Sequence, residues 1–358
     1  MPSLKEIKGR INSISSTLAI TSAMKMVAAA KLQKAQMAIQ NMLPYERRLH
    51  SMLIDLMGAM NISAAASEDG SVRGSGSAER GFDQSGDRLS LSNRHDLAGM
   101  DGAYSLMAQR EVRKVAIVAF ASNSSLCGAF NSNVIREATA VINEYRASGL
   151  GDADITVYSV GRKMAEAMKK LGFPSPADFT KMSDSPSYDA ASALAQELFD
   201  GFVSGRFDKV ELVYNHYKST SSQPTTRQTY LPLSLADATA DIQVGKITDS
   251  ASETDTNKVA EPVGAPVVRQ GSPTTEDLIV EPSKEALIAT LLPKVIRLRI
   301  FTTLLDSAAA EHAARTVAMQ LATDNGNDLL QELTLEYNKG RQQKITSEIL
   351  DLVGGSMQ

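Results

Sequence analysis

Both ends of the chain carry apolar residues at the spacing of a coiled coil, and this pattern limits the possible folds more than any other feature. From Ser3 to about Ala59, apolar side chains alternate steps of three and four residues, as in a helix that packs against another helix. Ser3 and Glu6 form a capping-box pattern that begins the helix, and Pro44 is expected to kink it without ending it. The expected seam consists of Leu4, Ile7, Ile11, Ile14, Leu18, Thr21, Met24, Ala28, Ala35, Ile39, Met42, Leu49, Leu53, Leu56 and Met57.

The C-terminal part of the chain repeats this pattern over a longer stretch, about residues 284–354. At ~1.5 Å per residue it predicts a helix on the order of 105 Å long, against roughly 80 Å for the N-terminal helix. Gly326 and Gly340 interrupt the seam, which is rich in small and polar residues. The expected seam is Ile288, Leu291, Val295, Leu298, Thr302, Leu305, Ala309, Leu330, Leu333 and Tyr337, then a shifted seam at Ile345, Ile349 and Leu352. Two such helices at opposite ends of one chain most simply pair antiparallel, as a rod.

The middle of the chain has the pattern of a small Rossmann-like α/β domain, residues 112–235. Four short apolar runs predict strands, and helical patterns lie between them, which favours a sheet with right-handed crossovers. The expected strands are 114–120, 155–160, 209–217 and 228–233, and the expected helices are 133–147, 164–171 and 192–203.

Two further stretches fit neither pattern. Residues 61–111 and 236–277 are poor in large apolar side chains and rich in small and polar ones. This composition is typical of flexible surface insertions, although 242–247 and 265–269 could form a short hairpin. The insertions would separate an N-terminal coiled-coil helix, 1–60, and a C-terminal one, 278–358, from the central domain.

No group of side chains has the spacing of a catalytic or metal site. Residues 122–133 follow a predicted strand and precede a helix, where a phosphate-binding loop would lie, but they contain neither glycine-rich phosphate motif. A structural turn is therefore favoured. Cys127 is the single cysteine, so no internal disulfide can form, and we interpret it as a small buried hydrophobe. The four histidines occur singly, without metal-ligand spacing, and no cofactor is predicted: His50, His95, His216 and His312.

Charge is unevenly distributed along the chain. The net charge is −4, which argues against a polycation built to bind nucleic acid. Residues 1–50, however, hold eight basic residues and only two acidic ones, Glu6 and Glu46. A solvated helix usually mixes both signs, so this helix indicates an acidic partner surface around it. No stretch approaches the ~20 apolar residues of a membrane span. The N-terminus lacks the apolar region of a secretory signal, so we expect a cytosolic setting unless a partner holds the chain at a membrane.

Several short motifs at the two ends identify a known family. The N-terminal stretch SLKEIKGRINSISSTLAITSAMKMVAAAKLQKAQ and the C-terminal stretch ARTVAMQLATDNGNDLLQELTLEYNKGRQQKITSEILDLVGG closely resemble the gamma subunit family of F-type ATP synthases. LCGAFN, 126–131, resembles the cysteine-glycine turn of that family's central domain. The resemblance covers roughly residues 1–60, 112–235 and 276–358.

The resemblance implies a central rotor shaft. In the family, the terminal helices form an asymmetric antiparallel coiled coil inside a ring of alternating alpha and beta subunits. The α/β domain lies at the foot and binds the epsilon subunit and the membrane c-ring. Rotation driven by proton or sodium flow drives the catalytic sites of the ring, so this chain would be non-catalytic. It would lie at the cytoplasmic face of a bacterial inner membrane, without direct insertion.

The resemblance also suggests partner contacts. Met24 and Arg315 match positions that contact the lever loop of beta. Arg341, Gln342 and Thr346 match positions that hydrogen-bond a catching loop of beta. The basic residues expected to face the acidic lower loops of the ring are Lys8, Arg10, Lys25, Lys31 and Lys34.

The chain departs from the family pattern at two places. Asn123, Ser124 and Ser125 replace an Asp-Arg-Gly triplet before the cysteine-glycine turn, and Ala129 replaces its second glycine. The insertions at about 61–111 and 236–275 have no counterpart in the common family pattern. Two other readings stay open: a nucleotide-binding α/β enzyme with helical arms, and a static coiled-coil scaffold.

Overall fold

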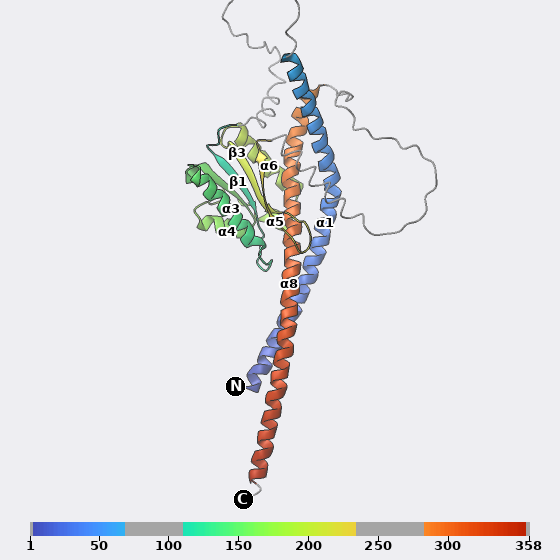
Figure 1. Cartoon of the computed structure of the whole chain (residues 1–358), viewed down its shortest axis with the longest axis vertical. Coiled ribbons are helices and arrows are strands. Elements are labelled where there is room, and N and C mark those ends of the chain that lie inside the picture. Colours follow the sequence, from blue (N-terminus) through green and yellow to red (C-terminus); the bar gives the residue numbers. More distant parts are fainter. Residues whose placement is uncertain (1–2, 69–109, 234–282, 356–358) are drawn as a thin grey trace, which may run out of the picture.

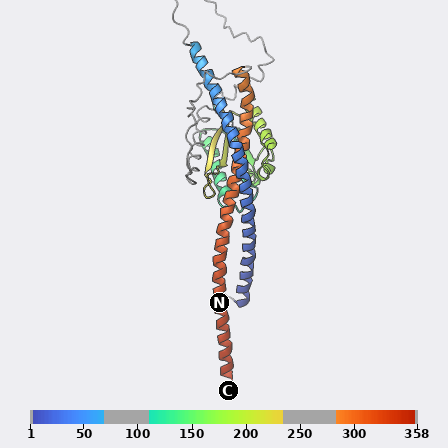
Figure 2. The same ribbon diagram turned by 90° about the vertical axis from the view of Figure 1, so that its right-hand side faces the viewer.

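Two long helices form the axis of the molecule. The computed structural model describes residues 3–68, 110–233 and 283–355. Helix α1, Leu4–Glu68, and helix α8, Lys284–Gly355, run side by side in opposite directions (Figure 1). A view from a second direction shows the same pairing, with the N-terminus part-way along α8 (Figure 2). The predicted antiparallel coiled coil is confirmed.

The buried side chains of α1 follow the predicted seam. Ile7, Ala28 and Leu53 are among its buried positions. Leu32 is also buried, and the sequence analysis missed it although it continues the same spacing. Pro44 lies inside α1 without ending it. The helix continues to Glu68, beyond the expected end near Ala59, because residues 64–66 are three alanines, the strongest helix former.

The expectation that Ile345, Ile349 and Leu352 extend the seam is wrong. All three are exposed, Leu352 with 74% of its surface accessible. The reason is the stagger of the two helices. Leu4, the first residue of α1, lies beside Gly340, so α8 continues beyond the end of its partner. The tip of the coil is therefore a single helix.

The central domain is built on a four-stranded sheet in the order β2-β1-β3-β4. Strands β1 (Val115–Phe120), β2 (Ile155–Val160) and β3 (Lys209–Asn215) are parallel. Strand β4 (Thr225–Leu231) is antiparallel to β3 and starts three residues earlier than predicted. All four predicted strands are thus present.

Helices cover both faces of the sheet. Helices α3 (Phe130–Ala147) and α4 (Arg162–Lys170) close one core with the sheet. Helix α6 (Tyr188–Val203) lies on the other face, between the sheet and α8 (Figure 1). These three helices match the predicted ones, whereas the short helix α5 (Thr180–Asp184) and the 3₁₀ turn Asp152–Asp154 were not predicted. The core under α6 also includes Leu49 of α1 and Leu292 of α8, so the domain and the coil share one hydrophobic core.

Most of the two predicted insertions, and the possible hairpin of 242–247 with 265–269, lie outside the described residues. Residues 61–68 belong to α1 and not to an insertion. In the part of the chain that the structure describes, no helix has the length and hydrophobicity needed to cross a membrane.

Candidate functional site

The predicted basic residues lie along the first half of α1. Lys8, Arg10, Lys31 and Lys34 are exposed, and Lys25 is half-buried. The Arg10 guanidinium forms an ion pair with Glu6 one turn earlier, at 3.0 Å, so part of its charge is already neutralised. The remaining lysines carry the unbalanced positive charge of this helix.

An apolar surface accompanies the basic residues, and the sequence analysis missed it. Met24 is half-buried in the seam, as predicted. Ile20, Met26 and Val27, which lie off the seam, are each more than half exposed. Large apolar side chains grouped at the surface usually mark a place where another protein binds. These three apolar residues lie outside the heptad positions, and this feature of the sequence could have indicated an exposed apolar surface.

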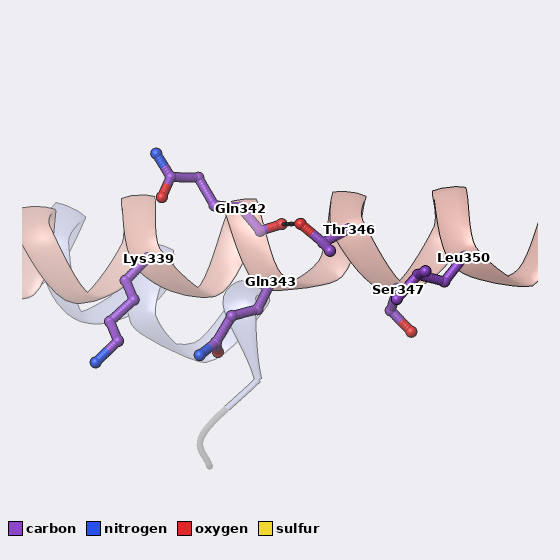
Figure 3. A pocket seen from close by; sticks show the side chains of 6 residues that line it. All are labelled: Lys339, Gln342, Gln343, Thr346, Ser347 and Leu350. Carbon is purple, nitrogen blue, oxygen red and sulfur yellow. Dashed lines mark hydrogen bonds between the residues drawn. The ribbon is translucent and has the colours of Figure 1, made fainter.

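The lower end of α8 presents polar side chains on a single helix. Arg341, Gln342 and Thr346 are exposed there. Lys339, Gln342, Gln343, Thr346, Ser347 and Leu350 line a shallow hollow, with the start of α1 behind it (Figure 3). The Thr346 hydroxyl donates to the backbone oxygen of Gln342 at 2.9 Å. The Gln342 side chain extends away from the helix, where its amide can donate and accept hydrogen bonds.

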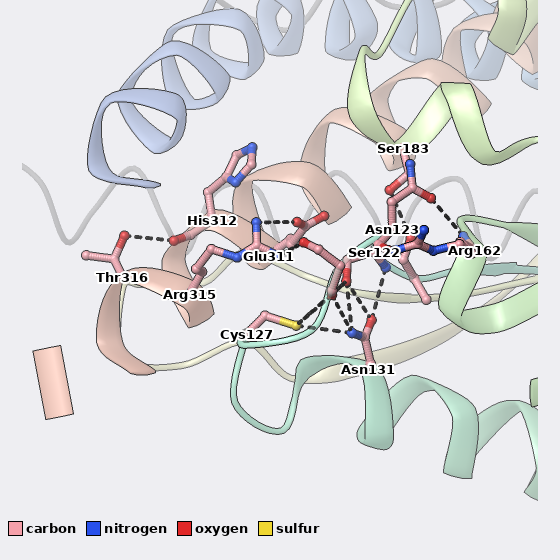
Figure 4. A network of polar contacts seen from close by, with 12 residues as sticks. Ser122, Asn123, Cys127, Asn131, Arg162, Ser183, Glu311, His312, Arg315 and Thr316 are labelled. Carbon is pink, nitrogen blue, oxygen red and sulfur yellow. Dashed lines mark hydrogen bonds and ion pairs between the residues drawn. The ribbon is translucent and has the colours of Figure 1, made fainter. Parts of the chain in front are cut away.

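Arg315 lies in a different environment from the other predicted contact residues. Its side chain is only 12% exposed. One guanidinium nitrogen, Nη1, lies 2.8 Å from Glu311 Oε1, and the other, Nη2, donates to Ser124 Oγ at 2.7 Å (Figure 4). Arg315 therefore joins α8 to the loop that follows β1.

This loop, residues 122–131, uses its polar groups within the chain. Asn131 Oδ1 accepts from the Ser122 amide at 3.0 Å, and Asn131 Nδ2 donates to Cys127 Sγ at 3.2 Å (Figure 4). Asn123 accepts from the Arg162 amide at 2.8 Å and donates to the Thr180 carbonyl at 2.7 Å. The loop therefore forms the predicted strand-to-helix turn between β1 and α3.

Cys127 is buried and packs against α8, beside Phe130 and Ala310. Gly128 follows it with a φ of 58°, which a glycine adopts without strain, and lies near Ala318. The cysteine therefore packs as the predicted small hydrophobe. Among the described residues, no three His, Cys, Asp or Glu side chains are grouped so that they could hold a metal ion.

Two titratable residues of α8, Glu311 and His312, lie near Arg315, where α8 meets this loop. Burial lowers the pKa of His312 to about 4, and the positive charges of Arg315 and Lys31 add to the effect. Its Nδ1 atom is buried without a hydrogen-bond partner in the described part of the chain. Burial raises the pKa of Glu311, against the opposing attraction of Arg315. His312 is thus held neutral, and the Glu311–Arg315 pair supplies the charges at this junction.

Comparison with known proteins identifies the family. A family model described as ATP synthase matches residues 3–357. The ATP synthase gamma chain of Phocaeicola vulgatus is 47% identical over 357 residues, which cover 100% of both chains. The chain belongs to the ATP synthase gamma-chain family. The gamma chains of Bacteroides thetaiotaomicron and Flavobacterium psychrophilum are 45% and 35% identical, over 100% and 99% of this chain and 100% and 98% of their own lengths.

A chain of a solved structure shares the fold. The structure is that of Euglena gracilis mitochondrial ATP synthase, OSCP/F1/c-ring, in rotational state 3, with a TM-score of 0.52 and 18% identity. The match covers 99% of this gamma chain and 93% of the other chain. The matches to the bacterial relatives cover the whole of this chain, residues 61–111 and 236–277 included.

Proposed function

We propose that this gamma chain is the central rotor shaft of a bacterial F-type ATP synthase. It is a non-catalytic subunit that transmits torque between the ion-driven c-ring and the catalytic sites of the alpha/beta ring. Its coiled coil enters that ring, and its central domain binds the epsilon subunit and the c-ring at the cytoplasmic face of the membrane. The observation that carries the proposal is the staggered antiparallel coil of α1 and α8, joined to a lateral domain (Figures 1 and 2).

The cross-section of the coil suits rotation inside a sleeve. Where α1 and α8 run together the shaft is two helices wide, and beyond Gly340 it is one helix wide. Small side chains keep the lower part narrow: Thr21 and Thr323 meet through their hydroxyls at 3.1 Å, where a coiled coil usually has Leu or Ile. An uneven and slender shaft can contact three surrounding sites differently without locking into any of them.

The two other readings are less well supported. The side chains of Ser122, Asn123 and Asn131 in the 122–131 loop are hydrogen-bonded within the chain, and the loop contains neither glycine-rich phosphate motif, which disfavours a phosphate site there. Isothermal calorimetry of ATP with the purified chain should show no micromolar binding. A static scaffold would need long, uninterrupted apolar seams for self-association, whereas small side chains interrupt the seam of this coil at Thr21–Thr323 and Gly326. Sedimentation should accordingly find a monomer.

A rotation assay tests the proposal directly. Cys127 is the only cysteine and is buried, so Lys170→Cys on α4 offers a single accessible thiol for a bead. The complex is purified from native membranes through a tag on its beta subunit and fixed to a surface. We expect the labelled chain to co-purify with alpha, beta and epsilon, and the bead to turn stepwise when ATP is added. A stationary bead on a complex that hydrolyses ATP would contradict the proposal.

A further inference from the structure

The turn between β3 and β4, residues 216–224, reaches from the central domain to both helices of the coil. His216 Nδ1 lies 2.6 Å from Asp306 Oδ2 of α8. The backbone amide of Tyr217 donates to the other oxygen of the same carboxylate, Asp306 Oδ1, at 2.9 Å. Gln36 of α1 donates to the Tyr217 hydroxyl at 2.6 Å. Two adjacent residues of the turn thus bind one side chain from each helix; these four residues, His216, Tyr217, Gln36 and Asp306, are called the polar joint below.

The polar joint is fixed to the sheet on its other side. Asn215, the last residue of β3, donates to the Phe130 carbonyl at 3.1 Å and accepts from Thr225 Oγ1 at 2.7 Å. The His216 amide donates to the Pro224 carbonyl at 2.9 Å, which closes the turn. When the sheet moves, His216 and Tyr217 should therefore move with it.

The rest of the contact between the domain and the coil is mainly apolar, but it also includes hydrogen bonds to α8. These join Arg297 to Gln196 at 2.7 Å, the Tyr230 hydroxyl to the Ile296 carbonyl at 2.9 Å, and Arg315 to Ser124 at 2.7 Å. Helix α6 and one face of the sheet pack against α8 between Ile288 and Leu304, in a core that also includes Leu53 of α1. Apolar burial resists separation but is non-directional, so it opposes sliding and rotation only weakly. Hydrogen bonds depend strongly on angle and distance. The polar joint follows this apolar contact along α8, and the loop after β1 contacts α8 beyond it, at Ala310 and Arg315.

Charge strengthens the polar joint. Asp306 is mostly buried, and both of its oxygens are used by the turn. His216, whose side chain is 40% exposed, donates a hydrogen bond to this carboxylate. Asp306 raises the pKa of the His216 ring, and the positive charge of Lys218 in the same turn opposes this effect. Hydrogen bonds to a buried charge are stronger than neutral ones. The Tyr217 ring adds packing against Ala309 and Ala310 of α8.

From this arrangement we infer that the polar joint is a directional connection between the central domain and both helices of the coil, so that part of the torque passes between them through His216 and Tyr217. The inference rests on the proposed rotor function and names residues that position the shaft relative to its foot. None of the four acts on nucleotide; each acts by holding one element in place against another.

Two single variants remove the polar joint while keeping the packing. Tyr217→Phe deletes the hydroxyl that Gln36 binds and keeps the ring, and Asp306→Asn removes the charge that His216 and the Tyr217 amide share. Tyr145→Phe is the matched control. The Tyr145 hydroxyl also makes a buried 2.6 Å hydrogen bond, to Glu211, but both partners lie inside the central domain.

The variants are compared in the assembled complex in membrane vesicles. Hydrogen exchange of the peptide containing the Tyr217 amide should rise about tenfold in Asp306→Asn, because a charge-assisted bond is lost. The double variant combines Tyr217→Phe with Asp306→Asn. With the bead on the central domain and the alpha/beta ring fixed to a surface, the torsional stiffness between them should fall roughly twofold in this variant. Protons pumped per ATP hydrolysed should fall in parallel, with Tyr145→Phe at the wild-type value on all three measures.

The outcomes separate this inference from the proposed function. If the wild-type chain neither rotates nor supports pumping, the rotor function is wrong. If the wild type rotates and the double variant matches both it and the control in stiffness and in pumping per ATP, torque does not pass through the polar joint and the inference fails. His216→Lys, which keeps a positive donor, should retain wild-type stiffness beside Asp306 but not beside Asn at position 306; equal stiffness in the two backgrounds would also overturn it.

Discussion

Leu18 of α1 packs directly onto Gly326 of α8, so closely that a Cβ atom at position 326 would lie 2.6 Å from Leu18 Cδ2. Leu4 occupies the same kind of place at Gly340, where the corresponding distance is 3.1 Å. Glycine costs a helix interior about 1 kcal/mol relative to alanine. These two glycines therefore mark places where the two helices come unusually close.

A larger side chain at position 326 should destabilise the coil. We expect Gly326→Leu to lower the free energy of unfolding by ~1–2 kcal/mol, because overpacking outweighs the gain in helix propensity. Urea unfolding of the purified chain, followed by circular dichroism, measures the change. Gly9→Leu is the control: no atom lies within 4 Å of a Cβ there, so it should stabilise the chain by up to ~1 kcal/mol. Equal effects at the two positions would contradict the close approach.

The ion pair between His216 and Asp306 should make stability depend on pH. The hydrogen bond and charge of Asp306 raise the pKa of His216 above its ordinary value of 6.5, against burial and Lys218. The folded state thus binds the proton more tightly than the unfolded state. The resulting stabilisation is complete below the unfolded pKa and is lost as the pH rises through the raised pKa.

Comparing wild type with His216→Gln isolates this contribution. The difference in unfolding free energy should be larger at about pH 6 than at about pH 9, by a few tenths to ~1 kcal/mol after allowance for the partly exposed ring. Urea titrations at the two pH values measure it. A difference that grows toward alkaline pH would contradict the assigned direction.

His312 should make stability depend on pH in the opposite direction to His216. Its pKa is lowered to about 4 by burial, Arg315 and Lys31, so the unfolded state binds the proton more readily. Stability is therefore lost as the pH falls from about 6.5 toward about 4. His312→Gln should remove this acid sensitivity, worth roughly 1–2 kcal/mol. Thermal unfolding of wild type and variant across this range measures it, and parallel curves would show that the ring is not buried neutral.

Removing the single-helix tip should impair assembly and torque without unfolding the rest. Deleting residues 341–358 takes away Arg341, Gln342 and Thr346, and α1 has no residue beyond Leu4 beside them. Circular dichroism of the truncated chain should show an unchanged melting transition for the central domain. Full ATP synthesis and full co-purification with beta would remove these three residues from the mechanism.

The lysines of α1 should matter through charge. Reversing Lys25, Lys31 and Lys34 to Glu should slow rotation several-fold at low salt, and added salt should reduce the difference between variant and wild type by screening. Lys169→Glu with Lys170→Glu, at the outer end of α4, is the control and should leave the speed unchanged. A slow variant whose defect is independent of salt would point to lost packing instead, since Lys25 is half-buried.

The sequence predicted what depends on local periodicity. The heptad seam of α1, the β-branched run of β1 and the turn at Cys127 can each be recognised within a short window, and the structure has all three. Leu32 fits the same spacing and is buried, so it too is predictable from the local pattern.

Features that depend on the relative placement of distant segments could not be predicted. The stagger of the helices follows from which residue of α1 meets which of α8, and Leu4 and Gly340 are far apart in the sequence. The same is true of Asp306 with His216 and Tyr217. The bond of Arg315 to Ser124 could not be predicted either, because it requires the folded loop. All the predicted partner contacts stay predictions: Met24, Arg315, Arg341, Gln342, Thr346, Lys8, Arg10, Lys25, Lys31 and Lys34.

The lone end of α8 has a consequence for how the protein is made. Three large apolar residues are exposed on this single helix: Ile349, Leu350 and Leu352. A newly synthesised chain would therefore present an apolar surface to which other chains could bind. Copies of the chain produced without a partner that covers this end would therefore tend to aggregate there. The unequal lengths of α1 and α8 thus favour production of the chain together with the protein that covers its tip.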